Sequence, residues 1–335
     1  MSRRSLLIAA LAALGLLAGC AKPAPDTTVN FSILSAEDQT SMGKVWQPLL
    51  DDLTEQTGVK VKPFFAGNYT ALIEAMRFNQ TQIGWFSALP ALEAVNRSNA
   101  DVLVRVVTGG GEGVYQSVLI TKKGSGITLD GMLKCGKRYS FGIGDARSTS
   151  GTLAPTAYVF IPHGIEPADC FKIVRSASHQ SNLFSVANGV LDVATNNTVG
   201  LVFAKRENPE LADKIQVIWT SPSLPESSIV ARRDLDPKVR DKLKTFFLNY
   251  GKAAGAQGDH ERQVLKGLAY AGFMPAGEGY LDPIREMDAS QTLGEAKKTG
   301  EPAKIQAAQK AYDAVEAQVA AHKATANKIG TQPSS

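Results

Sequence analysis

The sequence predicts an α/β protein with two similar lobes, which are joined by two crossing strands and enclose a cleft. From Val29 to Phe86 the chain alternates β-rich segments with segments of helical apolar spacing in the order βαβαβ, which is typical of a parallel sheet. After two further strand-like segments, DVLVRVVTG and VYQSVLITKKG, the alternation starts afresh near Thr121. The stretches MRFNQTQIGWF and SVANGVLDVAT share one order of helix, Asn-containing turn and strand, a weak repeat that supports two like lobes. Because ligands bind beyond the carboxyl ends of parallel strands, residues that directly follow strands are the candidates for function.

On this interpretation the chain divides into six parts. They are a signal peptide (1–20), a tether (21–28), a first lobe (29–120 plus 222–300), a second lobe (121–221), a C-terminal helix (301–326) and a disordered tail (327–335). Helices dominate the last hundred residues, since Asp236-Pro237 and Asp282-Pro283 each combine an N-cap residue with proline at the first helical position.

The first twenty residues, MSRRSLLIAALAALGLLAGC, have the basic start, short apolar run and small residues of an export signal. The apolar run is shorter than the roughly 20 residues that a membrane span needs. It ends in Leu17-Ala18-Gly19-Cys20, which resembles the lipobox of bacterial lipoproteins, so we expect Cys20 to carry a lipid. The alternative is a buried N-terminal helix with an incidental cysteine. We therefore expect the protein in the periplasm or on the outer face of the cytoplasmic membrane, anchored through Cys20.

The charge balance excludes a strong basic field. The chain has 36 Lys and Arg against 32 Asp and Glu, and removal of Arg3 and Arg4 with the signal leaves 34 against 32. Nucleic-acid binding rests on a much larger excess of positive charge, so no nucleic-acid partner is expected.

Two cysteines, Cys135 and Cys170, remain once Cys20 is assigned to the lipid. In an oxidising compartment two spare thiols commonly pair, which predicts a Cys135–Cys170 disulfide. The alternative is two buried reduced cysteines.

A cluster of hydroxyl residues, Ser148, Thr149 and Ser150, lies in the stretch DARSTSGTLAP, directly after the strand expected at 139–144. The first turn of a helix has N–H groups without partners and a positive dipole, so it binds anions. Added hydroxyl groups suit a tetrahedral oxyanion, whereas ordinary N-capping, the alternative, needs only one such residue. Because Pro155 is unfavourable inside a helix, we expect an irregular first turn or a late start of the regular helix.

Other strand ends place further candidates at the same cleft. His179 follows the strand FKIVRSA and could give an anion a hydrogen bond or a charge. Tyr69 follows the second strand of the first lobe, and Trp85 and Phe86 end its third. Aromatic side chains there would close over a small ligand and exclude water. Since Trp85 and Phe86 are neighbours on one strand, only one of them can face the cleft.

Catalysis and metal binding have little support. Ser148 or Ser150 with His179 and Asp145 or Asp192 resembles a hydrolase triad, but the chain has no G-x-S-x-G motif. The sequence also has no HExxH, no CxxC and no close carboxylate cluster, so no metal and no cofactor is expected.

The last helix carries apolar residues at steps of three and four, which form a narrow seam typical of a coiled coil. The residues of this seam are Ile305, Ala308, Tyr312, Val315 and Val319. The seam predicts either a homodimer through this helix or packing of the helix across its own lobe.

Three segments together resemble the phosphonate-binding, PhnD-type solute receptors of bacterial ABC importers. They are FFAGNYTALIEAMRFNQTQIGWFSALPALEAV, FGIGDARSTSGTLAP and VANGVLDVATNNT. The resemblance implies a type II periplasmic-binding-protein fold, with two Rossmann-like lobes around the cleft, and an ABC permease in the inner membrane as partner. It also implies that the phosphonate group of the ligand is held by Ser148, Thr149, Ser150, His179 and Tyr69.

The departures from this family bear on the ligand. By the resemblance, receptors for aminoalkylphosphonates carry a tyrosine at the position of Phe86, a glutamate at that of Val199 and an aspartate at that of Ser227. Burial of an ammonium group without an acidic partner costs several kcal/mol, so we expect a phosphonate with an uncharged or small tail, or phosphite, unless Glu226 turns inward. The loss of the tyrosine at Phe86 would also leave one donor fewer in the cleft.

The sequence thus predicts a solute-binding lipoprotein that captures a phosphonate or related phosphorus oxyanion and delivers it to a permease. One alternative is a receptor for inorganic phosphate or another oxyanion. The alternative from a different class is an exported serine-dependent esterase or phosphatase.

Overall fold

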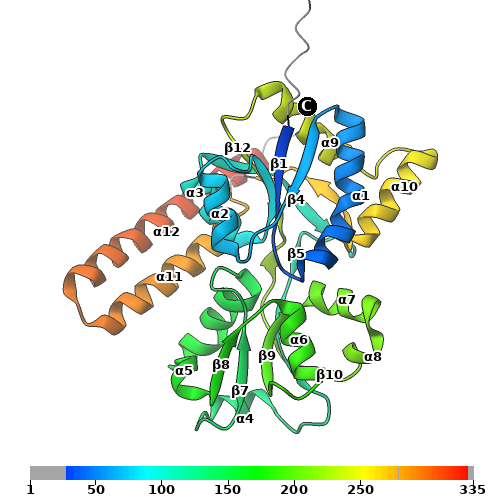
Figure 1. Cartoon of the computed structure of the whole chain (residues 1–335). Coiled ribbons are helices and arrows are strands. Elements are labelled where there is room, and N and C mark those ends of the chain that lie inside the picture. Colours follow the sequence, from blue (N-terminus) through cyan, green and yellow to red (C-terminus); the bar gives the residue numbers. More distant parts are fainter. Residues whose placement is uncertain (1–27, 278, 331–335) are drawn as a thin grey trace, which may run out of the picture.

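The computed structural model describes residues 28–277 and 279–330 and has two lobes, each built on one sheet (Figure 1). The strands are β1 (Thr28–Ile33), β2 (Lys60–Phe64), β3 (Ile83–Phe86), β4 (Ala100–Thr108), β5 (Val114–Tyr115), β6 (Ser117–Lys122), β7 (Ser140–Ile143), β8 (Ile173–Ser176), β9 (Val193–Asn197), β10 (Ile215–Thr220), β11 (Leu224–Pro225), β12 (Ser228–Arg232) and β13 (Tyr270–Met274). The α-helices are α1 (Gln39–Thr57), α2 (Tyr69–Arg77), α3 (Ala88–Arg97), α4 (Leu129–Leu133), α5 (Pro167–Cys170), α6 (His179–Ala187), α7 (Thr198–Glu207), α8 (Pro209–Ala212), α9 (Pro237–Asn249), α10 (Gly255–Gly267), α11 (Asp282–Thr299) and α12 (Pro302–Gly330). Wide π-helical turns form η1 (Thr149–Leu153) and η2 (Thr156–Phe160), and a 3-10 turn forms η3 (Ile161–His163).

The first sheet has the order β13-β4-β12-β3-β1-β2 and the second the order β10-β6-β9-β7-β8. In the first sheet β2, β1 and β3 run parallel, which confirms the βαβαβ opening that the sequence predicts. In the second sheet β7 is parallel to both β8 and β9. The carboxyl ends of these parallel strands point toward the other lobe, where the ligand of such a sheet is expected.

The chain crosses between the lobes twice, and the crossings pair with each other. β5 and β11 form an antiparallel ribbon between the two sheets, with Leu224 opposite Tyr115. β6 already belongs to the second sheet from Ser117, earlier than the Thr121 expected, because Ser117 pairs with Asn197 of β9. The chain returns to the first sheet with β12.

Each lobe has its own apolar interior. In the first lobe Trp46 of α1 packs between Phe31 of β1 and Trp85 of β3, with ring centroids 5.5 and 5.3 Å apart. In the second lobe Phe141 of β7 stacks on Phe171 at 4.5 Å. Buried aromatic side chains contribute most to burial free energy, so these clusters fix the strands that lead to the site.

A disulfide joins Cys135, just after α4, to Cys170 at the end of α5, with their Cα atoms 4.5 Å apart. The same connection includes a hydrogen bond from the N–H of Lys137 to the carbonyl of Cys170 at 2.9 Å. The segment that leads into β7 is thereby tied to the end of the helical segment that follows β7.

The last two helices, α11 and α12, lie side by side as a hairpin that extends away from the lobes (Figure 1). The seam on α12 has one buried residue, Val319, and four partly buried ones, so α11 of the same chain covers it. The position of Asp282 before a proline predicts that it caps α11, but the structure shows otherwise. Its carboxylate instead pairs with His322 of α12 at 2.8 Å.

α12 continues to Gly330, past the end at residue 326 that the sequence predicts, so residues 327–330 are helical and not a disordered tail. Residues 331–335 lie outside the described residues, as do the expected signal peptide, Cys20 and most of the tether. Within the described ranges no helix combines the length and apolarity that crossing a bilayer requires.

Candidate functional site

The hydroxyl cluster lies at the carboxyl end of β7, where two glycines fold the chain back on itself. Gly144 donates its N–H to the carbonyl of Gly151 at 2.9 Å, and a Cβ on Gly144 would lie only 2.6 Å from the Cα of Gly151. A side chain at either position would separate the two backbones. The close approach brings Ser148, Thr149 and Ser150 over the end of the strand.

One hydroxyl of the cluster caps the turn and leaves two main-chain donors open. Ser148 Oγ accepts the N–H of Gly151 at 3.0 Å, which is the N-cap role. The N–H groups of Thr149 and Ser150 have no acceptor among the described residues. Open N–H groups at a helix start are the donors that bind an anion.

The helix after the cluster is irregular, as its proline predicts. Wide π turns flank Pro155 on both sides, in η1 and η2. Proline has no N–H to donate and its ring obstructs the carbonyl four residues earlier, so a regular α-helix through this position is unfavourable. Single π turns of this kind occur frequently at functional sites.

A cavity of about 60 Å³ lies between the lobes at this turn. Six residues predicted from the sequence line it, namely Tyr69, Ser148, Ser150, His179, Val199 and Ser227. They come from both lobes and from the crossing segments, so both lobes contribute walls to the cavity.

Thr149, the seventh predicted residue, does not line the cavity and instead joins the lobes. Its Oγ1 accepts the N–H of Leu89 at 2.8 Å and donates to Oγ of Ser87 at 3.3 Å, both at the start of α3 in the first lobe. The side chain is fully buried. Thr149 therefore links the second lobe to the first by hydrogen bonds in this arrangement.

Further polar contacts cross the cleft beside Thr149. The N–H of Tyr69 donates to Asp145 Oδ2 at 3.2 Å, and the N–H of His179 donates to the carbonyl of Ala36 at 3.2 Å. Each bond joins one lobe to the other at the rim of the cavity. The structure therefore has the form that would enclose a ligand.

The eighth predicted residue, Phe86, does not line the cavity. Its ring is completely buried in the core of the first lobe, whereas its neighbour Trp85 lines the cavity. Successive side chains of a strand point to opposite faces, and on β3 the cavity face belongs to Trp85. The donor that Phe86 lacks is supplied by Tyr115 of β5, whose buried hydroxyl lines the cavity and has no hydrogen-bond partner among the described residues.

His179 is neutral in this environment. The ring is 4% exposed, and burial lowers its pKa from the usual 6.5 to about 4. Its Nε2 lies 3.3 Å from Oγ of Ser150. Burial also raises the pKa values of Tyr69 and Tyr115 above their usual range, so both hydroxyl groups keep their protons and can donate them in hydrogen bonds.

Two carboxyl groups also line the cavity: Glu37, to which the sequence did not point, and Glu226, which turns inward and so meets the exception named above for the tail of the ligand. Burial raises the pKa of Glu37 to about 8, with a further contribution from the neighbouring Asp38. Burial also raises the pKa of Glu226, whose Oε1 accepts the N–H and the hydroxyl of Ser227 at 2.8 and 2.9 Å. Its Oε2 is buried without a partner among the described residues.

The Ser150–His179 pair lacks the acid of a hydrolase triad. Asp192 accepts both the N–H and the hydroxyl of Ser140, and Asp145 accepts the N–H of Tyr69 and of Arg147. Neither carboxylate is hydrogen-bonded to the imidazole. Among the described residues no group of three or more His, Cys, Asp or Glu side chains is placed to hold a metal ion.

A family model for the periplasmic phosphonate substrate-binding proteins of ABC transporters matches residues 31–278, nearly the whole two-lobed body. The chain belongs to this family. Members are substrate-binding components of transporters, and the chain is such a component rather than an enzyme. The resemblance read from the three sequence segments is confirmed.

Individual proteins that are similar to this chain support the assignment to the family. The chain is 41% identical to the phosphonates-binding periplasmic protein of Escherichia coli over 263 residues, which are 78% of this chain and 76% of that protein. Its fold matches the crystal structure of a binding-protein component of an ABC phosphonate transporter from Pseudomonas aeruginosa with a TM-score of 0.82, at 33% identity over 91% of this chain and 100% of that one. The structure of PhnD1 from Prochlorococcus marinus in complex with methylphosphonate matches in fold with a TM-score of 0.70, at 21% identity over 79% and 98% of the two chains. These neighbours confirm the type II periplasmic-binding fold.

Proposed function

We propose that this protein is a lipid-anchored receptor that captures a phosphonate or a related phosphorus oxyanion between its lobes and presents it to a membrane permease. The observation that carries the proposal is the set of donors at one wall of the closed cavity. The open N–H groups of Thr149 and Ser150 lie at the same turn as the hydroxyls of Ser148 and Ser150. Neutral donors hold a doubly charged anion well because charge-assisted hydrogen bonds replace its water shell.

We further propose that the ligand has an uncharged or small tail. Val199 and Ser227 stand where the aminoalkylphosphonate receptors have acidic residues, and both line the cavity. Glu226 is the remaining carboxyl beside them, but one of its oxygens already accepts from Ser227, and burial raises its pKa. Burial thus disfavours the charged form of this carboxyl, which is the form that would pair with an ammonium group.

Titration calorimetry tests both proposals with four ligands: methylphosphonate, phosphite, inorganic phosphate and 2-aminoethylphosphonate. Binding of methylphosphonate or phosphite in preference to the other two supports the proposal, and preference for inorganic phosphate supports the phosphate-receptor alternative. Ser150→Ala should weaken binding, whereas Ser290→Ala on the exposed face of α11 should not. Hydrolysis of a chromogenic ester that Ser150→Ala abolishes would instead support an esterase or phosphatase.

The lipid anchor is a separate part of the proposal. It is supported by the sequence around Cys20 and by the periplasmic family to which the chain belongs. A fatty-acid analogue that labels the wild-type protein, but not Cys20→Ala, would establish the anchor, and an unlabelled wild-type protein retained in soluble form would refute it.

A homodimer through α12 is also a separate proposal. It would have to use the faces of α12 that α11 leaves exposed, since α11 already covers the seam. Light scattering of the purified protein tests this proposal. A mass of two chains would support the homodimer, and a mass of one chain would refute it.

A further inference from the structure

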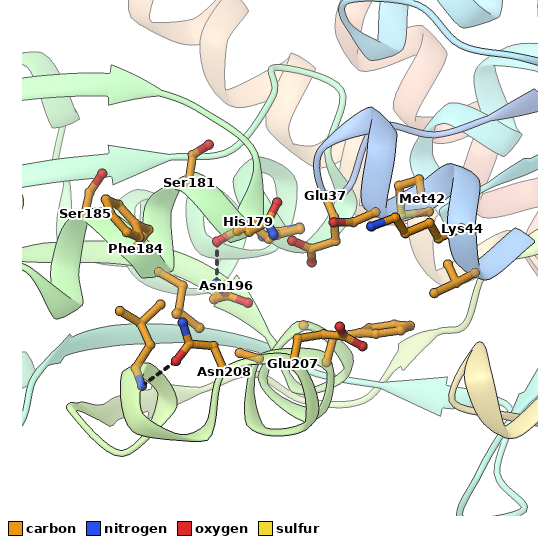
Figure 2. Close-up of a pocket in the computed structure, with 18 residues that line it drawn as sticks. Glu37, Met42, Lys44, His179, Ser181, Phe184, Ser185, Asn196, Glu207 and Asn208 are labelled. Carbon is orange, nitrogen blue, oxygen red and sulfur yellow. Dashed lines mark hydrogen bonds between the residues drawn. The ribbon is translucent and has the colours of Figure 1, made fainter.

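A second compartment lies beside the cavity, between α1 of the first lobe and α6, α7 and α8 of the second (Figure 2). Its volume is about 560 Å³, against about 60 Å³ for the inner cavity. Sites for small molecules usually have roughly 300–1,000 Å³. The inner cavity therefore has room for a phosphoryl group and a small substituent, whereas the second compartment, hereafter the outer compartment, has room for a larger organic group.

The two compartments share a wall. Glu37, Met42, His179, Gly200 and Phe203 line both of them. Gly200 adds no side chain to this wall, and Glu37 and Met42 are unbranched side chains with several rotatable bonds, so part of the wall consists of side chains that can change conformation without a movement of the backbone. In Figure 2 Glu37 and Met42 approach from the α1 side and His179 from the α6 side, so the wall lies where the two lobes meet.

Apolar side chains contribute much of the lining of the outer compartment, beside polar ones such as Lys44, Glu207 and Asn208. The apolar ones include Val45 of α1, Leu183 and Phe184 of α6, Phe203 of α7 and Leu211 of α8. Phe184 is 57% exposed to solvent. A large aromatic side chain that faces a cavity of this size gains free energy when an apolar group covers it.

We propose that the outer compartment holds the organic tail of the ligand, so that the chain takes phosphonates with an alkyl or aryl tail of several carbon atoms. The inference rests on the proposed function, because the phosphoryl group stays at Ser148–Ser150 in the inner cavity. The first atoms of the tail stay there too, beside Val199 and Ser227, and only the remainder of a longer tail passes the shared wall. A tail in this position contacts helices of both lobes and stabilises the closed arrangement.

Calorimetry with methyl-, butyl-, hexyl- and phenylphosphonate tests the inference on the full chain without its signal peptide. Each buried methylene adds to affinity, so we expect hexylphosphonate to bind at least about tenfold tighter than methylphosphonate. Phe184→Ala should weaken hexylphosphonate by about threefold or more and leave methylphosphonate within about twofold. The matched control is Phe78→Ala, which changes a similarly exposed phenylalanine of the first lobe that lines neither compartment.

The outcomes separate this inference from the proposed function. If methylphosphonate binds and affinity falls steadily with tail length, the tail inference is overturned and the proposed function stands. If long tails bind tightly but Phe184→Ala behaves like Phe78→Ala, the tail lies elsewhere and the inference is overturned as well. If none of the four phosphonates binds, both fail.

Discussion

Oγ of Ser150 lies 3.3 Å from Nε2 of His179, and this contact joins the first turn of η1 to the first residue of α6. The two segments follow β7 and β8, which are neighbours in the second sheet. A hydroxyl and an imidazole that are 29 residues apart in sequence therefore meet at one edge of the sheet. Both are buried, and the neutral imidazole adds a hydrogen-bonding group to the proposed phosphoryl site without adding a charge.

The buried His179 should make the stability of the ligand-free protein depend on pH. Its pKa is about 4 in the folded protein, against an ordinary value of 6.5. Between these two pH values the imidazole is therefore protonated in the unfolded chain but not in the folded protein. The stabilisation is complete above pH 6.5 and is lost as the pH falls from 6.5 toward 4, by up to about 3 kcal/mol. Denaturant unfolding of wild type and His179→Gln across this range measures the effect.

His179→Gln should flatten the slope between pH 6.5 and pH 4, and His163→Gln, at the exposed end of η3, should keep it. Equal slopes in wild type and His179→Gln would show that the ring titrates normally in the folded protein.

Thr149→Ala should weaken every phosphorus ligand by a similar factor. The substitution leaves the N–H of Leu89 without its acceptor and removes a bond between the lobes, which costs about 1–2 kcal/mol. This corresponds to a loss of roughly five- to thirtyfold in affinity. Calorimetry with methylphosphonate and phosphate measures it, with Thr156→Ala in η2 as the control. A change of ligand preference, rather than a uniform loss, would contradict the closing role of Thr149.

Binding should weaken at high pH because of Glu37. Its pKa is about 8, so the carboxyl is mostly neutral at pH 7 and becomes negatively charged above pH 8, where it repels the anionic ligand. Between pH 7 and pH 9 the affinity of wild type for methylphosphonate should fall by about three- to tenfold relative to that of Glu37→Gln. Comparison of the two proteins at each pH removes the titration of the ligand itself, and a constant ratio of affinities would refute the account.

The double change Val199→Glu with Ser227→Asp should improve binding of 2-aminoethylphosphonate selectively. Both side chains line the cavity, and two carboxylates there would pair with the ammonium group. We expect a gain of about tenfold or more for this ligand and none for methylphosphonate, measured by calorimetry. If the selectivity of the double variant equals that of wild type, these positions do not contact the tail.

Local patterns predicted the strands, the open turn and the irregular helix, because each depends on neighbouring residues. Local patterns could not predict which face of β3 points toward the cavity. Trp85 and Phe86 have similar propensities, and only the position of the sheet within the lobe decides which one meets the cavity. Tyr115 was missed, and the inward turn of Glu226 was left open, because the two residues come from the two crossing segments, which are distant in sequence and lie close together only through the pairing of β5 with β11.

Glu37 could have been found. It lies shortly after the end of β1, and the rule that function follows the carboxyl ends of strands applied to that position as well as to His179. For Asp282 a local pattern led to a wrong prediction. The residue was expected to cap α11, but its carboxylate is hydrogen-bonded to a histidine forty residues later in the chain.

A crystal structure of the protein soaked with methylphosphonate tests the central claim most directly. We predict the phosphorus atom in the inner cavity, with its oxygens within hydrogen-bond distance of the N–H groups of Thr149 and Ser150 and of the side chains of Ser148, Ser150 and Tyr69. A methylphosphonate bound elsewhere, with those two N–H groups still unpartnered, would contradict the account.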